Sequence, residues 1–347
     1  MRTIVELQQQ LAPDLLEVLK RRYRILQQVG QTEYIGRRAL AGVLAMTERV
    51  LRAETDFLKA QGLLDIRQSG MQLSDSGRQL LDQLAPTMKE LAGLTELEER
   101  IRSRYGLRKV VIVSGDSEAS EHVKRELGRA GAQVLRGYMA PGDVVAVTGG
   151  TTMAHVAGQL SSQRPLADIR FVPARGGLGE SVDYQANTIV STMAKRTGAQ
   201  YRLLHVPDHL GEEAYQSLMQ EPNIREIVEV IRSARIVLHG IGDAMVMARR
   251  RKEAEPAVAA MRSEGALAEA FGFYFDRSGN VVHRMPTAGL RLEEIQTAEV
   301  VIAIAGGRGK GEAIAAVMRF GHDDVLITDE AAALEMLRTF EADADEV

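Results

Sequence analysis

Residues 144–152 read VVAVTGGTT, a short β-branched run followed at once by two glycines and two threonines. Such an apolar run is typical of a strand buried on both faces, and the glycines allow a tight turn into a helix. Comparable runs, separated by segments of helical periodicity, occur at 110–113, 168–173, 201–206, 235–239, 300–304 and 324–328. We therefore expect residues 109–347 to form a doubly wound α/β domain with a mostly parallel sheet, and residues 272–284 to form an inserted hairpin.

Three strand ends of this domain carry glycines beside hydroxyls or cations. Ligands of open α/β sheets bind beyond the carboxyl ends of the strands. The first loop opens a helix whose free amide groups and threonine hydroxyls suit a phosphate, and the other two loops supply an arginine and a lysine. The residues concerned are Gly149, Gly150, Thr151, Thr152, Arg175 and Lys310. Each loop alone is also explained as a structural turn, but the three together predict a site for a phosphorylated small molecule. The run 249–252, Arg-Arg-Arg-Lys, offers either a second anionic pocket or a solvated helix face.

Several kinds of catalytic site are disfavoured by the sequence. The loop before Ala313 is not a P-loop, because Ile304 stands where its first glycine should be and Gly311 replaces the magnesium-binding hydroxyl. The GxG at 240–242 lacks the fuller dinucleotide pattern. The seven histidines show no metal-ligand spacing, and His239, at a strand end, is expected to be a core residue. We expect no catalytic residues, no metal and no cofactor.

The N-terminal part of the chain carries a basic block, residues 20–52. It holds eight basic and two acidic residues, a net charge of +6 in a chain whose net charge is -4. Such a block can supply phosphate contacts to DNA, although a solvated basic face of a helical domain explains the charge equally well.

The pattern around this block is that of a winged helix-turn-helix domain, which we place at residues 1–86. Helices are expected at 11–29, 36–44 and 47–61, followed by short strands at 63–67 and 71–73 and a fourth helix at 75–84. In this arrangement the third helix enters the major groove. The expected DNA contacts are Arg37, Arg38, Thr47, Glu48, Arg49, Arg52 and, on the wing, Arg67.

A linker helix is expected between the two domains, in residues 87–108. Leu91, Leu94, Leu97 and Ile101 form an apolar stripe along it. The stripe could pair with another subunit or pack onto the same chain's C-terminal domain, and the sequence favours neither.

Composition places the chain in the cytoplasm. There is no cysteine, which fits a reducing compartment. The first ten residues are polar, and no run of 18 apolar residues occurs, so we expect neither a signal peptide nor a membrane span. Aromatic residues make up 4% and tryptophan is absent, which counts against stacking platforms for single-stranded nucleic acid.

The ordered set of motifs resembles the SorC family of bacterial sugar-responsive repressors, over essentially the whole chain. Besides the winged helix, it comprises Gly115-Asp116-Ser117, residues 145–153, 175–179 and 240–243, Gly265-x-x-x-Glu269-x-x-Gly272, and residues 306–310. The resemblance implies a homo-oligomer, dimer or tetramer, that represses a glycolytic operon by binding a double-stranded DNA operator. It implies fructose 1,6-bisphosphate as an effector that is bound without turnover and weakens DNA binding. Gly149, Gly150, Thr151, Thr152, Arg175 and Lys310 would hold one phosphate, Arg250 the other, and Gln185 and Glu269 the sugar hydroxyls.

The competing hypothesis is a sugar-phosphate isomerase or deaminase, because such enzymes use the same type of sheet and phosphate loops. Asp243 and Glu269 would then be candidate bases. Those isomerases are expected to carry an Asp-Gly-x-Asp-Glu strand end, whereas this chain has Gly-Ile-Gly-Asp at 240–243. A fused DNA-binding domain also favours the repressor.

Overall fold

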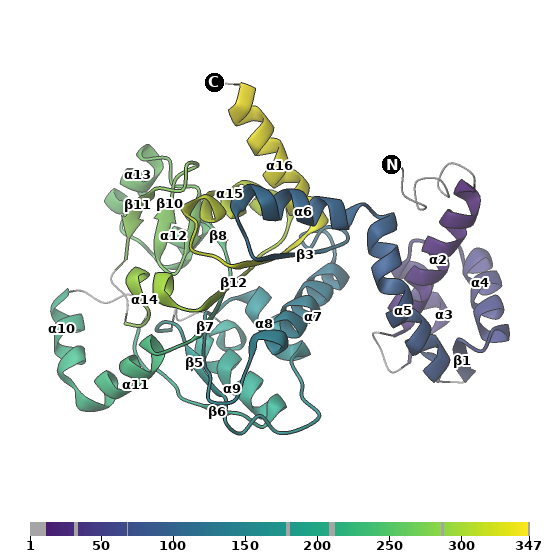
Figure 1. Cartoon of the computed structure of the whole chain (residues 1–347), viewed down its shortest axis with the longest axis horizontal. Coiled ribbons are helices and arrows are strands. Elements are labelled where there is room, and N and C mark those ends of the chain that lie inside the picture. Colours follow the sequence, from purple (N-terminus) through teal and green to yellow (C-terminus); the bar gives the residue numbers. More distant parts are fainter. Residues whose placement is uncertain are drawn as a thin grey trace. The chain divides into compact units, whose positions relative to one another are not determined.

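The computed structural model describes residues 12–30, 34–67, 69–177, 181–207, 212–285 and 288–345. The chain divides into two compact units, Met1–Thr95 and Glu96–Val347. Figure 1 follows the chain from the purple N-terminal unit to the yellow C-terminal helix. Within the described ranges no helix is both long enough and apolar enough to cross a membrane. Leu178 and Gly179, the last two residues of the motif at 175–179, lie outside these ranges.

The N-terminal unit has the helix-turn-helix and wing expected from its sequence. Its elements are α2 (Pro13–Val29), α3 (Arg37–Val43), α4 (Glu48–Ala60), the antiparallel strands β1 (Leu64–Arg67) and β2 (Gly70–Leu73), and α5 (Asp75–Leu91). Thr47 begins α4, because its side chain accepts a hydrogen bond from the amide of Val50. Fully buried side chains from three helices and the wing, among them Ile25, Leu40, Leu51 and Met71, form one core. The apolar spacing read from the sequence is therefore the packing face of these helices.

The expected helix ends after the wing are wrong. Helix α5 continues through Pro86 to Leu91 instead of ending near residue 84, because a proline inside a helix removes only one backbone donor. The chain turns at Gly93, whose φ is +71°, and α6 (Leu94–Tyr105) follows, so the linker predicted at residues 87–108 is not a single helix. The stripe residues Leu91, Leu94, Leu97 and Ile101 are all buried, the first two in the N-terminal unit and the last two in the C-terminal unit, and the role of the stripe stays a prediction. The proposed domain limits at residues 86 and 109 stay predictions.

The C-terminal unit is built on a seven-stranded, all-parallel sheet in the order β3-β13-β12-β7-β4-β5-β6. The strands are β3 (Lys109–Val113), β4 (Val144–Val147), β5 (Arg170–Pro173), β6 (Gln200–Tyr201), β7 (Ile236–His239), β12 (Val300–Ile304) and β13 (Val325–Asp329). Every residue of β7, β12 and β13 is buried, so helices must cover both faces of the sheet there. The expected α/β class is confirmed. The strand expected at 201–206 is wrong, because only its first residue pairs with β5.

Helices connect the parallel strands. Figure 1 labels the connecting helices α7 (Glu121–Tyr138), α8 (Thr151–Gln159), α9 (Ala186–Thr197), α10 (Glu212–Gln220), α11 (Pro222–Arg232), α14 (Leu292–Thr297) and α15 (Gly311–Phe320), and α16 (Glu330–Asp345), which follows the last strand. The connections also include the short helices η1 (Val182–Tyr184) and η2 (Arg308–Lys310). Helix α8 packs between α7 and α9. Because α8 and α15 each begin just after a strand, their N-termini lie at the carboxyl edge of the sheet, where the site was expected.

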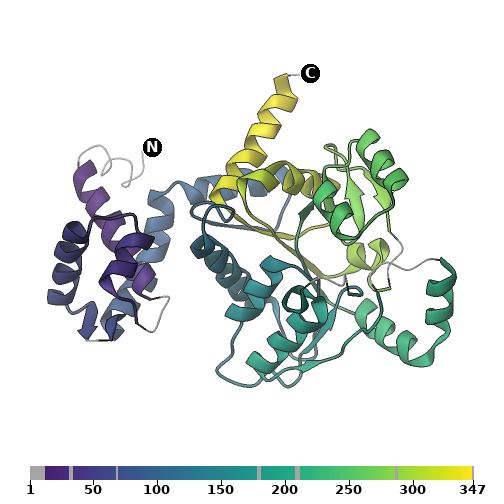
Figure 2. The same ribbon diagram turned by 180° about the vertical axis from the view of Figure 1, so that it is seen from behind.

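The inserted hairpin is part of a larger antiparallel sheet, shown in green in Figure 2. Its strands are β8 (Gly242–Asp243), β9 (Ala268–Ala270), β10 (Phe273–Phe275) and β11 (Val281–Arg284), and it is accompanied by α12 (Ala244–Arg250) and α13 (Glu255–Ser263). Tyr274 of β10 and Met285, the residue after β11, pack against Ala248 and Met261 of these helices. The insert follows directly from β7, so it holds its own residues beside the strand ends of the large sheet.

Candidate functional site

A cavity of about 390 Å³ opens at the carboxyl ends of the parallel strands. Its described lining comes from the β4–α8 and β12–α15 loops, the ends of β5 and β7, and the inserted sheet. All the residues predicted to bind the effector line this one cavity: Gly149, Gly150, Thr151, Thr152, Arg175, Gln185, Arg250, Glu269 and Lys310. Their placement together is a result of the structure, and their role in binding stays a prediction.

The loop between β4 and α8 presents only part of the donors expected of it. The amide of Gly150 donates to the carbonyl of Tyr184 at 2.8 Å and is therefore unavailable to a ligand. A Cβ on Gly149 would lie 2.8 Å from that same carbonyl oxygen, which explains the glycine. The amides of the first helical turn, Thr151 to Met153, have no acceptor within the helix and remain the donors that a phosphate could meet.

A buried carboxylate, that of Asp329, holds the loop that carries Lys310. Asp329, at the end of β13, accepts hydrogen bonds from the amides of Gly307 (2.7 Å), Ser117 (2.8 Å) and Ala332 (2.9 Å). Burial lowers the pKa of Lys310 below its ordinary value, while the neighbouring carboxylate of Glu118 acts in the opposite direction. An anion placed beside Lys310 would counteract the effect of burial and favour its protonated form.

Two arginines of the cavity share one carboxylate. Glu269 Oε1 lies 2.8 Å from Arg251 and 3.3 Å from Arg175, and it accepts the amide of Gly272 at 2.6 Å. Burial by itself raises the pKa of Glu269, but the charges of Arg251 and Arg175 and the Gly272 amide outweigh it, so this pKa lies below the usual value. A carboxylate held in this way is a poor proton acceptor near neutral pH.

The other candidate base of the enzyme hypothesis also has a structural role. The Asp243 side chain accepts the amide of Val246 at 2.8 Å and caps α12. Both carboxylates that an isomerase would need are therefore engaged in supporting the site rather than positioned as free bases.

Sequence reasoning missed three residues that also line the cavity, namely Glu118, Tyr184 and Arg251, and it considered Asp243 only as a candidate base. Arg251 belongs to the run of basic residues at 249–252, but only Arg250 of that run was predicted to bind the effector. Glu118 follows the Gly-Asp-Ser motif and accepts the amide of Gly309 at 2.9 Å, across 191 residues. No local sequence pattern predicts a contact between residues so far apart in the chain.

The candidate nucleic-acid interface is the start of α4 and the wing. Thr47, Glu48, Arg49, Arg52 and Arg67 are all exposed, and among the described residues neither Arg49 nor Arg52 has an acidic partner. Arg38 is 3.3 Å from Glu48, and Arg37 is 3.6 Å from Asp56. Both arginines of α3 therefore already have an acidic partner.

Some of the basic side chains in residues 20–52 form ion pairs within the domain, so not all of the charge of this block is available for binding DNA. Arg21 and Arg22 of α2 lie 2.7 and 2.8 Å from Glu54, a buried residue of α4. The Arg22 guanidinium also lies 3.6 Å from the ring centroid of Phe57. These two arginines therefore hold α2 against the candidate recognition helix, which the sequence count could not distinguish from phosphate contacts.

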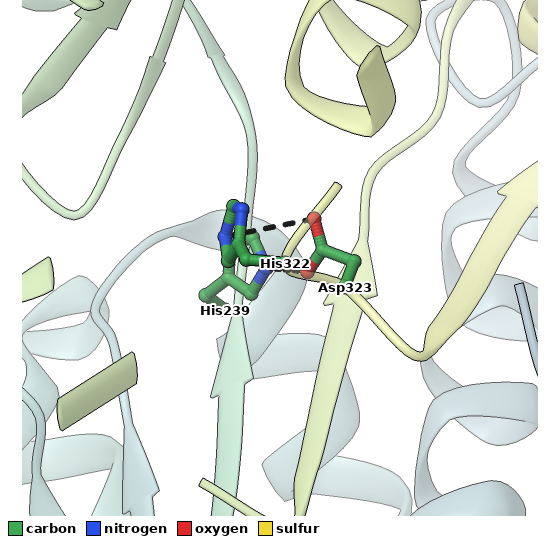
Figure 3. Close-up of side chains that lie close together, drawn as sticks. All are labelled: His239, His322 and Asp323. Atoms are coloured by element: carbon green, nitrogen blue, oxygen red, sulfur yellow. Dashed lines mark hydrogen bonds and ion pairs between the residues drawn. The ribbon is translucent and has the colours of Figure 1, made fainter. Parts of the chain in front are cut away.

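Three side chains of metal-binding type meet in the C-terminal unit: His239, His322 and Asp323 (Figure 3). His239 Nε2 lies 2.6 Å from Asp323 Oδ1, and both side chains are buried. Two ligands of a tetrahedral zinc ion with bonds of about 2.0 Å would lie about 3.3 Å apart, so the pair has the geometry of a hydrogen bond rather than of zinc coordination. The prediction that His239 is a hydrogen-bonded core residue is confirmed.

Comparison with protein families assigns a class to each unit. Residues 18–88 match the CggR N-terminal DNA binding domain, and residues 89–338 match the sugar-binding domain family Sugar-bind. Together with the winged helix-turn-helix and the cavity at the strand ends, these matches define a DNA-binding transcriptional regulator with a sugar-binding domain.

Individual relatives narrow this class. The chain is 48% identical, over 98% of its length, to the whole central glycolytic genes regulator of Priestia megaterium. It is 44% identical, over 97% of its length, to 99% of the protein of that name from Bacillus subtilis. The chain belongs to the SorC family of transcriptional regulators, in the group of the central glycolytic genes regulators.

Solved structures agree with this assignment. A SorC family transcriptional regulator from Enterococcus faecalis matches with a TM-score of 0.66 at 42% identity, over 70% of this chain and 99% of that one. The full-length sorbitol operon regulator SorC of Klebsiella pneumoniae matches at 19% identity with a TM-score of 0.67, over 93% of this chain and 99% of that one, which supports the fold. The prediction of a regulator rather than an enzyme is confirmed.

Proposed function

We propose that this protein represses a glycolytic operon by binding a double-stranded DNA operator, and that fructose 1,6-bisphosphate bound in the cavity modulates this binding. The observation that carries the proposal is the convergence on one cavity of all nine residues predicted to bind the effector. The relatives named as regulators of central glycolytic genes support the choice of operon.

Cations from two different segments of the C-terminal unit support a bisphosphate over a monophosphate. Lys310 lies with the first turn of α8 in the described lining, and Arg250 and Arg251 come from the end of α12 in the insert. The described lining holds four cationic and three acidic side chains, Arg175, Arg250, Arg251 and Lys310 against Glu118, Asp243 and Glu269. One of the acids, Glu269, already partners two of the arginines, so the cavity suits a ligand that brings its own negative charge.

Thermal melting tests the choice of effector. A ligand at 100 times its dissociation constant adds about 2.7 kcal/mol of stability to the folded state. We expect fructose 1,6-bisphosphate to raise the melting temperature more than fructose 1-phosphate, fructose 6-phosphate or inorganic phosphate at equal concentration. A larger shift with a monophosphate would contradict the bisphosphate, and no shift with any of the four would contradict the site.

Arg52 tests the assignment of the DNA-binding surface. It is exposed on the second turn of α4, so Arg52→Ala should weaken operator binding by about 1–3 kcal/mol, measured by fluorescence anisotropy at fixed salt. Lys59→Ala, at the far end of the same helix, is the control and should change affinity by less than about 0.5 kcal/mol. Equal losses in the two variants would show a general charge effect and contradict the assignment of α4 as the recognition helix.

We further propose that the protein acts in the cytoplasm as a homo-dimer or homo-tetramer. Winged and helix-turn-helix proteins commonly bind paired half-sites as symmetric dimers, since one recognition helix reads only a few base pairs. Light scattering of the free protein and of its operator complex distinguishes the two assemblies, and a monomer in both would contradict the proposal.

A further inference from the structure

The strands β9 and β10 of the insert are joined by a turn of only two residues. Ala270 pairs with Phe273, which leaves Phe271 and Gly272 in the loop. Their φ angles are +55° and +85°, the values of a type I′ turn. The first position of such a turn is normally asparagine, aspartate or glycine, because a bulky side chain at positive φ meets its own backbone.

Phenylalanine therefore stands where the local backbone disfavours it. Gly272 is explained by its surroundings, since a Cβ there would lie 2.8 Å from the Arg175 guanidinium. Phe271 has no such local reason. Backbone conformations of this kind persist where neighbouring structure holds them, and they concentrate at binding sites.

The surroundings of the Phe271 ring hold it in place. Its centroid lies 4.2 Å from that of the His239 ring, with 33° between the planes, and 5.9 Å from that of His322. His239 is itself fixed by its hydrogen bond to Asp323 (Figure 3). The buried histidine cluster thus supports the ring of Phe271, a residue that is 4% exposed and is among those that line the cavity.

The same turn also organises the charged part of the site. Glu269, two residues before Phe271, holds Arg251 and Arg175, and it accepts the amide of Gly272, the residue after Phe271. The turn that carries Phe271 is therefore tied, through Glu269 and the Gly272 amide, to the carboxylate that holds both arginines. Pockets for small molecules commonly combine an aromatic wall with a few oriented polar groups, so that the wall meets the carbon skeleton of the ligand.

We propose that Phe271 is a ligand-contacting residue that packs its ring against the carbon skeleton of the phosphorylated sugar and so distinguishes the sugar from inorganic phosphate. This inference rests on the proposed function and deepens it. The unfavourable turn conformation is kept because asparagine, which suits the turn better, would remove the ring from the cavity wall.

The test uses the full chain and two ligands, fructose 1,6-bisphosphate and inorganic phosphate, measured by isothermal titration calorimetry. Phe271→Asn gives the turn its preferred Asn-Gly pair and should weaken bisphosphate binding about tenfold, as expected for the loss of one aromatic contact, with phosphate affinity unchanged. Phe271→Leu keeps an apolar side chain and should give a smaller loss. Unchanged phosphate binding also shows that each variant is folded around the first turn of α8.

Lys252→Asn is the matched control, because Lys252 also has a positive φ, +56°, but is exposed and is not among the described residues that line the cavity. It should relieve the same kind of backbone cost and leave both affinities unchanged. Bisphosphate affinity within twofold of wild type in Phe271→Asn overturns the inference, and so does an equal loss for both ligands, which would mean that the ring acts through the fold. If the wild-type protein binds inorganic phosphate but no sugar phosphate, the inference fails with the proposed effector. If it binds neither ligand, the cavity assignment itself fails.

Discussion

Replacing Asp329 by alanine is expected to lower the free energy of unfolding of the sugar-binding unit by about 3–5 kcal/mol. The carboxylate is fully buried and accepts three backbone amides from three different segments, those of Ser117, Gly307 and Ala332. Alanine leaves these donors buried without an acceptor, which costs more than the hydrogen bonds themselves contribute. It also frees the loop that carries Lys310, so effector affinity should fall together with stability.

Urea unfolding of the full chain measures this effect. The steeper denaturant transition belongs to the larger unit, since the slope scales with the surface exposed on unfolding. Asp168→Ala is the control: Asp168 is exposed, so its replacement should change the free energy of unfolding by less than about 0.5 kcal/mol. A loss below about 1 kcal/mol for Asp329→Ala would mean that the loops at the strand ends do not depend on this carboxylate.

Lys310→Met should weaken fructose 1,6-bisphosphate binding by about 10- to 100-fold, the effect of losing one charge-assisted hydrogen bond of about 1.5–3 kcal/mol. Methionine keeps much of the length of the side chain, so the variant removes the charge with little change in packing. Operator affinity without effector should stay at the wild-type value, because the substitution lies in the C-terminal unit. Lys195→Met, on an exposed lysine in the last turn of α9, is the matched control and should bind as wild type.

The pH dependence of binding separates a charge effect from a packing effect at the same residue. Burial lowers the pKa of Lys310, and the protonated form is the one that attracts phosphate. The contribution of Lys310 to effector affinity should therefore be fully present below that pKa, and the affinity should fall as pH rises through it. Above about pH 7.5 the effector phosphates are already fully charged, given a second pKa near 6, so this fall reports on the protein. Lys310→Met should abolish it, and an unchanged pH dependence in that variant would remove Lys310 from the phosphate site.

Most of the large sheet could be predicted from its own residues. Strands buried on both faces consist of continuous β-branched runs, so β4, β7, β12 and β13 were recognisable without knowledge of their neighbours. Strand β6 was predicted too long, because at a sheet edge the neighbouring strand decides where pairing stops. The helix expected to end before Pro86 continues for another five residues to Leu91, since proline disfavours but does not forbid a helix.

Local sequence signals were enough to predict the two-domain class and the loops that carry the candidate site, because glycines, hydroxyls and cations at strand ends can be recognised in short stretches of sequence. The expected phosphate ligands line one cavity because parallel strands bring their carboxyl ends to one edge of the sheet. The pairing of charges became known from the folded structure alone. That structure showed Glu54 binding Arg21 and Arg22, and it placed Arg251 on Glu269. It also set the Phe271 ring against His239. These contacts join segments that are distant in the sequence, and the folded backbone, rather than any local propensity, sets their distances.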